Sequence, residues 1–278
     1  MNLLEKYFSD LQYKEGIYYK KSDLKLSYPD DGNQICFNVE DNSFWFKHRN
    51  QIISLLFKKK SPKKILFDVG GGNGFVSFGL MKEGINSILI EPGIQGCLNA
   101  KQRGLKNIVC STLEESGCLE NSIPAIGLFD VVEHIENDKL FIKKIHVYLE
   151  NEGFLYLTVP SFSFLWSSED ELAGHYRRYT LKEIEHLLES NGFKINFSSY
   201  MFSFLPIPIL IIRTLIGKFK PRKSSVLKTV KKEHNSSNYF IKIILNFFLK
   251  RETRKMSKGK KIKFGSSCIV VAQKIKNK

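Results

Sequence analysis

Glycines at positions 70, 72 and 74 constrain the fold of this 278-residue chain more than any other feature. They follow a short apolar run, residues 65–67, and an acid, Asp68. A buried strand that turns into a glycine loop lets the backbone approach a ligand closely, because glycine carries no Cβ. Residues 75–82 are expected to form a helix that directs its free N–H groups at the same place. The segment therefore predicts a loop that binds a nucleoside cofactor, although a glycine turn without a ligand would show the same pattern.

The spacing of the glycines indicates which cofactor to expect. Dinucleotide-binding loops follow Gly-x-Gly-x-x-Gly, whereas here the third glycine comes one residue early. Together with the acid that ends the strand, the pattern Asp-x-Gly-x-Gly-x-Gly resembles the first motif of class I S-adenosylmethionine (SAM) methyltransferases. The resemblance implies that SAM is the cofactor, with another nucleotide as the alternative. It also implies four cofactor-binding residues: Asp68, Gly70, Gly72 and Gly74.

A second strand is expected at residues 87–90, and it ends at Glu91. Glu91 lies 21 positions after Gly70, about where an acid binds the ribose hydroxyls in related folds. A carboxylate can accept hydrogen bonds from both hydroxyls. The alternative is an acid that only begins the next helix, beside Pro92. Glu91 is therefore a candidate ribose-binding residue.

Three further strands are expected at residues 107–110, 125–130 and 153–160. After the first of these strands, the resemblance places adenine contacts at Thr112 and Leu113. It adds Asp130, at the end of the next strand, as a further cofactor-binding residue. The resemblance extends to residues 128–135 and 153–160, which are similar to the fourth- and fifth-strand motifs of bacterial small-molecule methyltransferases of types 11, 12 and 23. Residues 44–50 and 165–180 are similar to segments of one branch of that family. The similarity covers roughly residues 40–200.

The fold expected from these elements is a Rossmann-like α/β fold with a mostly parallel sheet of seven strands and helices on both faces. Residues 193–200 and 266–274 would be the last two strands, with the final one antiparallel. A capping box, Thr180 to Glu183, predicts a helix that ends near Asn191. We divide the chain into an N-terminal helical segment (1–60), a SAM-binding core (61–200), a basic apolar insertion (201–265) and the final strand (266–278).

Basic residues are concentrated in the last part of the chain. Residues 201–278 hold 20 Lys and Arg against 2 Asp and Glu, whereas residues 1–200 hold 23 against 26. Such asymmetry suggests nucleic acid or an anionic membrane as a partner. Compositional bias would raise lysine throughout the chain, but it would not remove acids from one segment. An electrostatic role for the tail is therefore expected.

Two apolar stretches lie in this basic tail, at residues 201–217 and 239–250. The first is too short and too interrupted to predict a membrane span of about 20 residues. In the second, Lys242, Asn246 and Lys250 form one narrow polar stripe, so the helix must bury most of its circumference. Basic flanks at 218–232 and 250–263 fit a helix lying in a membrane interface. A lid or dimer surface is the alternative, and RNA is less favoured because exposed stacking aromatics are lacking.

Catalysis by such a fold requires orientation of the acceptor and, for a hydroxyl acceptor, a base. The candidate bases are His134, which follows the fourth expected strand, and His175; both could instead be packing residues. Arg177 and Arg178 are candidates for binding an anionic substrate, with salt bridges to the neighbouring acids as the alternative. Trp166 either lines the acceptor pocket or holds its loop. The sequence shows no cluster with metal-ligand spacing, so no metal site is expected.

Five cysteines without a Cys-x-x-Cys pair, and no signal-peptide pattern, indicate a cytoplasmic protein, peripheral to the inner face of the membrane if the tail binds lipid. The function expected is SAM-dependent methyl transfer to a small or lipid-linked acceptor, at oxygen. One alternative is an RNA or protein methyltransferase that docks through its tail. Another is a non-catalytic scaffold with a SAM-binding fold. The sequence does not define the oligomeric state.

Overall fold

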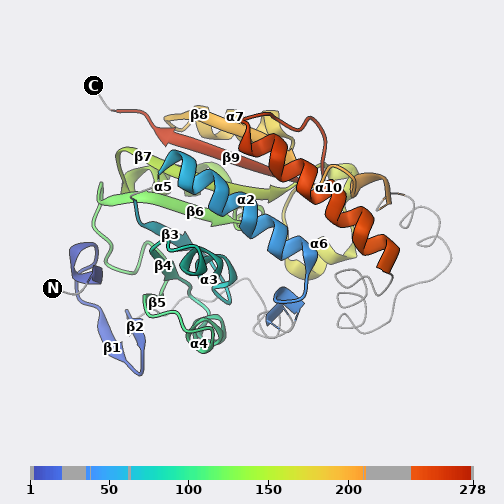
Figure 1. Ribbon diagram of the computed structural model, residues 1–278. Coiled ribbons are helices and arrows are strands. Elements are labelled where there is room, and N and C mark those ends of the chain that lie inside the picture. Colours follow the sequence, from blue (N-terminus) through green and yellow to red (C-terminus); the bar gives the residue numbers. More distant parts are fainter. Residues whose placement is uncertain are drawn as a thin grey trace.

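The computed structural model describes residues 3–20, 36–37, 39–61, 64–208, 210 and 239–276. This part of the chain forms one mixed sheet in the order β1-β2-β5-β4-β3-β6-β7-β9-β8 (Figure 1). The strands are β1 (Gln12–Lys14), β2 (Ile17–Tyr19), β3 (Leu66–Val69), β4 (Ser87–Ile90), β5 (Ile108–Cys110), β6 (Ile123–Phe129), β7 (Leu149–Pro160), β8 (Phe193–Met201) and β9 (Ser267–Lys274).

Strands β5, β4, β3, β6 and β7 run parallel, and β9 lies antiparallel between β7 and β8. The expected Rossmann-like α/β fold with an antiparallel last strand is confirmed. The sheet is larger than the expected seven strands, because a hairpin of β1 and β2 extends its edge. Tyr18 and Tyr19 of β2 pair parallel with β5, and Ile17 is buried beside them. A three-residue strand that gains its stability from a distant neighbour leaves no periodic pattern to detect.

Helices cover both faces of the sheet. They are α2 (Phe44–Lys60), α3 (Phe75–Lys82), α4 (Ile94–Gln102), α5 (Asp138–Tyr148), α6 (Ser168–Ala173), α7 (Leu181–Glu189) and α10 (Tyr239–Ser257), with short 3-10 turns η1 (Leu3–Lys6), η2 (Val132–His134) and η3 (Ser163–Leu165). Figure 1 shows α2 and α10 side by side in front of the sheet. The Thr180–Glu183 capping box is present and α7 begins at Leu181, as predicted.

The central strands are buried along nearly their whole length, as expected for parallel strands covered on both faces. Their side chains are mainly Leu, Ile, Val and Phe, so hydrophobic burial holds the sheet between its helix layers. The polar residues that the sequence singled out follow the carboxyl ends of β3, β4, β5 and β6. In open α/β sheets, ligands bind at this edge.

Helix α10 is longer than expected and continues to Ser257. Leu249, Glu252 and Met256 are buried against the body. We expected the helix to bury most of its circumference, and this prediction was wrong. Four of its apolar side chains are exposed: Ile243, Ile244, Phe247 and Phe248. Among the residues described, no helix is both long and apolar enough to cross a membrane. The predicted basic flank at 218–232 and most of the stretch at 209–217 lie outside the described residues.

Candidate active site

The glycine loop between β3 and α3 has the conformation that its sequence predicts. Gly70, Gly72 and Gly74 have φ angles of 68°, 54° and 68°, a region that side chains disfavour. A Cβ added to Gly70 would come within 3.0 Å of Val131, just beyond the end of β6. The glycine loop therefore lies against the end of β6, and His134 follows Val131 by three residues.

Glu91 is buried at the end of β4, beside this loop. Its Oε2 accepts a hydrogen bond from the Gly72 N–H at 2.9 Å, and its Oε1 accepts from the Gly93 N–H at 2.8 Å. Burial raises the pKa of Glu91 to about 7, and the two backbone hydrogen bonds oppose that rise. The carboxylate thus fixes the loop and retains acceptor capacity, because each ionised oxygen has two lone pairs.

Asp68 lies under the glycine loop. Its Oδ2 accepts from the backbone N–H and the hydroxyl of Ser77, at 3.2 and 2.8 Å, which ties β3 to α3. Its Oδ1 is buried and has no hydrogen-bond partner. Burial raises the pKa of Asp68 to about 6. The structure therefore gives Asp68 a role in supporting the loop.

The residues after β5 form a turn. Thr112 Oγ1 accepts from the Glu115 N–H at 3.2 Å, and Leu113 is buried. Ser111 Oγ is buried without a partner. Both candidate adenine contacts thus follow the end of β5, and Ser111 belongs to the same segment, 111–114, in which the resemblance places adenine contacts.

Asp130 begins the segment after β6 with a positive φ of 58°. Its carboxylate pairs with Arg49 of α2 and accepts from Thr158 Oγ1 at 3.0 Å. The Arg49 guanidinium lies over the Trp45 ring, 4.7 Å from its centroid. The aromatic and basic segment 44–50 therefore reaches the site through this ion pair.

His134 and His175 come together, with ring centroids 4.6 Å apart. Burial lowers the pKa of His134 to about 4, and the nearby His175 contributes to that shift. His134 is therefore neutral at pH 7. Glu133, an acid that the sequence offers as a weaker candidate for orienting a histidine, is fully buried next to them.

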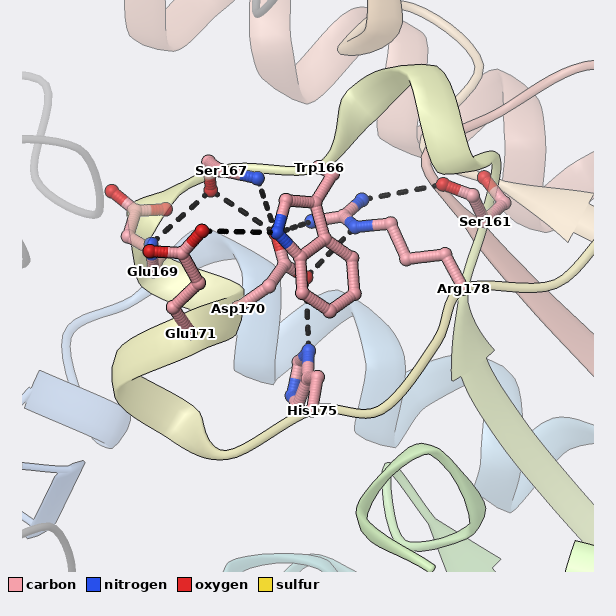
Figure 2. Close-up of polar contacts among 8 residues, drawn as sticks. All are labelled: Ser161, Trp166, Ser167, Glu169, Asp170, Glu171, His175 and Arg178. Carbon is pink, nitrogen blue, oxygen red and sulfur yellow. Dashed lines mark hydrogen bonds and ion pairs between the residues drawn. The ribbon is translucent and has the colours of Figure 1, made fainter. Parts of the chain in front are cut away.

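Asp170 organises the loop that carries His175 (Figure 2). It accepts from His175 Nδ1 at 2.9 Å, and from Arg178 Nε and Nη2 at 2.8 and 3.0 Å. Burial would raise the pKa of Asp170, but the hydrogen bonds from His175 and Arg178 hold it well below its usual range. Asp170 is therefore an anion that orients His175.

The substrate candidates on this loop all have protein partners. Arg178 makes the bidentate contact with Asp170 described above and also donates to the Ser161 carbonyl at 3.2 Å. Arg177 pairs with Asp138 at 2.8 Å. Trp166 is half-buried, and its Nε1 donates to Glu171 Oε1 at 3.5 Å. Arg178 thus makes the salt bridge to a neighbouring acid that the sequence offered as its alternative, whereas Asp138, the partner of Arg177, is not one of the neighbouring acids.

Comparison with known proteins agrees with this geometry. Residues 43–196 match the sequence profile of a family described as a methyltransferase domain. The chain belongs to the SAM-dependent methyltransferase family. No curated protein sequence matches this chain.

Solved structures show the same fold. Phosphoethanolamine N-methyltransferase 2 of Haemonchus contortus, in complex with SAM, is 19% identical, with a TM-score of 0.54 over 91% of this chain and 59% of that chain. The plantazolicin methyltransferase BamL is 17% identical, with a TM-score of 0.54 over 90% and 92%. A possible histamine N-methyltransferase of Thermotoga maritima is 13% identical, with a TM-score of 0.54 over 88% and 95%. This methyltransferase thus spans about three fifths of the first relative's length.

The residues present fit an adenosyl cofactor. The glycine loop leaves no room for side chains at Gly70 and Gly74, since a Cβ at Gly74 would lie 2.5 Å from Leu105. Ser111 and Asp68 each leave a buried polar oxygen without a partner. SAM is the family cofactor, and the glycine loop, Glu91 and the turn after β5 would hold it.

Glu91→Gln should weaken SAM binding by about 5- to 150-fold, which corresponds to about 1–3 kcal/mol. In the wild type, affinity should rise about tenfold between pH 6 and pH 8, because binding favours an ionised carboxylate whose pKa is raised to about 7. Titration calorimetry across this range measures both effects. Glu189→Gln, on the exposed end of α7, is the control and should bind as the wild type does. Equal affinities for the Glu91 variant and the wild type would exclude the ribose contact.

Proposed function

We propose that this chain transfers a methyl group from SAM to an oxygen atom of a small or lipid-linked acceptor. The observation that supports the proposal is the close approach of Gly70 in the glycine loop to Val131, three residues before His134 of the histidine pair. When bound, SAM supplies a methyl group that its sulfonium already activates. The chain must then place the acceptor oxygen in line with that methyl group.

The histidine pair supports oxygen as the acceptor atom. A hydroxyl must lose its proton during methyl transfer, so a group that assists this loss is useful. His134 is neutral at pH 7 because its pKa is lowered to about 4. His175 is oriented by Asp170 through its Nδ1. The two imidazoles thus lie next to each other, and a hydrogen bond orients the second of them.

Helix α10 supports a lipid-linked acceptor. Its exposed apolar side chains include Phe247, which is 60% exposed, and Ile244, which is 55% exposed. Exposed basic residues follow on the same helix: Lys250, Arg251, Arg254 and Lys255. Apolar side chains beside a basic cluster suit an anionic lipid surface. A lipid-linked substrate would then reach the site from that surface.

The proposed reaction is tested by incubating the full chain with methyl-labelled SAM and a cell extract of lipids and metabolites. We expect label in an O-methylated small molecule or lipid. Label in RNA or protein alone would contradict the proposed acceptor class. Calorimetry that shows no heat with SAM at millimolar concentration would overturn the reaction itself and favour a scaffold.

Reversing the charges of Lys250, Arg251, Arg254 and Lys255 to glutamate should reduce binding to anionic vesicles by about 100-fold or more, because each basic residue near such a surface contributes about 1 kcal/mol. Co-sedimentation with vesicles containing phosphatidylserine measures this change.

The matched control reverses four other exposed lysines, Lys139, Lys143, Lys182 and Lys194, and alters net charge equally. We expect that control to retain most of its vesicle binding. Unchanged sedimentation of the α10 variant would contradict the membrane proposal and leave the apolar face for a dimer or a lid.

A further inference from the structure

Three potential metal ligands meet beside the glycine loop, although the sequence predicted no metal site. Glu133 and His134 lie in η2, and His175 follows α6. Each offers one ligand atom, and these atoms lie within 4.8 Å of one another. The Tyr176 N–H donates to the Glu133 carbonyl at 2.8 Å, which ties the two segments together. The cluster therefore joins two loops that sequence spacing could not relate.

The Glu133 carboxylate is the second observation that points to a ligand. The residue is 0% exposed, and neither Oε1 nor Oε2 has a hydrogen-bond partner. Burying an unpaired carboxylate is costly, so it must take up a proton or a cation. The nearby arginines do not pair with it, because Arg49 pairs with Asp130 and Arg178 with Asp170.

The two imidazoles are held in the way that metal-binding histidines are held. His175 Nδ1 hydrogen-bonds Asp170 Oδ1 at 2.9 Å, which leaves Nε2 available as a ligand atom. Asp170 is itself fixed by Arg178 and Ser167 (Figure 2). His134 hydrogen-bonds the Ala173 backbone. Histidine ligands in proteins commonly give their other ring N–H to a carboxylate or a backbone carbonyl, which orients the ring for the metal.

We propose that Glu133, His134 and His175 bind one divalent first-row transition ion. Two imidazoles and one carboxylate suit Mn²⁺, Fe²⁺ or Zn²⁺ better than Mg²⁺, which prefers oxygen ligands. In a tetrahedral site, ligand atoms stand about 3.4 Å apart, so the observed cluster needs to close by about an ångström. Three protein ligands leave coordination positions open.

The open positions give the ion a role in the proposed reaction, and this part of the inference rests on the proposed function. A divalent ion lowers the pKa of a bound hydroxyl and orients it. With one carboxylate ligand, the site keeps a net positive charge that favours an anionic oxygen. The histidines would then act through the ion rather than as bases. The acceptor hydroxyl would release its proton to solvent, and its oxygen would form a bond to the methyl carbon as the sulfur–methyl bond breaks, leaving S-adenosylhomocysteine.

The test uses the full chain after treatment with a chelator and dialysis. Mn²⁺ is the probe, because the five free cysteines bind it less readily than they bind Zn²⁺. Titration followed by electron paramagnetic resonance of free Mn²⁺ should show one site per chain. Glu133→Gln and, separately, His175→Gln should each weaken that site by about 100-fold or more, whereas His186→Gln on the exposed face of α7 should not.

Absence of a stoichiometric site in the wild type would overturn the proposal, as would equal Mn²⁺ affinity in both ligand variants and the wild type. Circular dichroism is measured for both variants, and the Mn²⁺ affinity is compared for a variant that is folded. SAM affinity is measured separately on the metal-free chain. Loss of Mn²⁺ binding with retained SAM binding in a ligand variant is the expected result. Mn²⁺ binding by a wild-type chain that does not bind SAM would refute the proposed function and leave the metal site standing.

Discussion

Gly72→Val should abolish SAM binding while the chain stays folded. Gly72 has a φ of 54°, where a β-branched residue is strongly disfavoured. Its N–H also donates to Glu91, so a shift of this peptide disturbs the expected ribose contact as well. Calorimetry should detect no SAM binding at 1 mM, a loss of about 100-fold or more for a cofactor normally bound at micromolar concentration.

The control for this variant is Gly84→Val. Gly84 has a φ of 72°, and a Cβ there would meet nothing within 4 Å. It follows α3, at the opposite end of that helix from the glycine loop. Both variants should lose about 1–3 kcal/mol of unfolding free energy through backbone strain, but Gly84→Val should bind SAM as the wild type does. SAM binding by Gly72→Val at wild-type affinity would mean that the loop is not the cofactor site.

The glycine loop could be predicted because its information is local. A buried strand, three glycines at alternating positions and a helix follow one another within 17 residues, 66–82. The same holds for β4 with Glu91 and for the capping box of α7. In each of these segments, backbone conformation and side-chain type carry the signal without help from distant residues.

The roles of the two arginines could not be settled from the sequence. A guanidinium suits a phosphate, a substrate carboxylate or a neighbouring aspartate equally well. Asp170 and Asp138 lie on different helices, and only the fold shows that Arg178 contacts the first and Arg177 the second. The cluster of Glu133, His134 and His175 was missed for the same reason, because His175 reaches it through a separate loop.

In the basic tail, the sequence predicted the helix but not which of its side chains are buried. Its composition and apolar pattern were plain in the sequence, and α10 formed where the pattern predicted it. The pattern does not distinguish apolar residues that face the body from those that face outwards. Leu249 and Met256 contact the core, whereas Phe247 is exposed. This division depends on how α10 is attached to α2.

Glu252→Ala should lower the free energy of unfolding by about 3–5 kcal/mol, because it removes the acceptor of several buried or partly buried hydrogen bonds. Glu252 is 2% exposed. Its Oε1 binds His48 Nε2 at 3.1 Å and accepts from the Phe202 N–H at 2.7 Å, while Oε2 accepts from the Ser203 N–H and hydroxyl, each at 3.2 Å. One carboxylate thus links α10 to α2 and to the end of β8. Its removal leaves these donors buried without an acceptor.

Urea unfolding measures this loss. Glu189→Ala, at an exposed position of α7, is the control and should change stability by less than about 0.5 kcal/mol. Hydrogen exchange should show the amides of α10 losing protection more than those of β3 or β4, because the link that is broken belongs to that helix. Stability within 0.5 kcal/mol of the wild type, with α10 still protected, would contradict the assigned anchor. In the expected outcome, the apolar face of α10 is free to move independently of the body of the chain, so the geometry proposed for lipid docking depends on this single buried carboxylate.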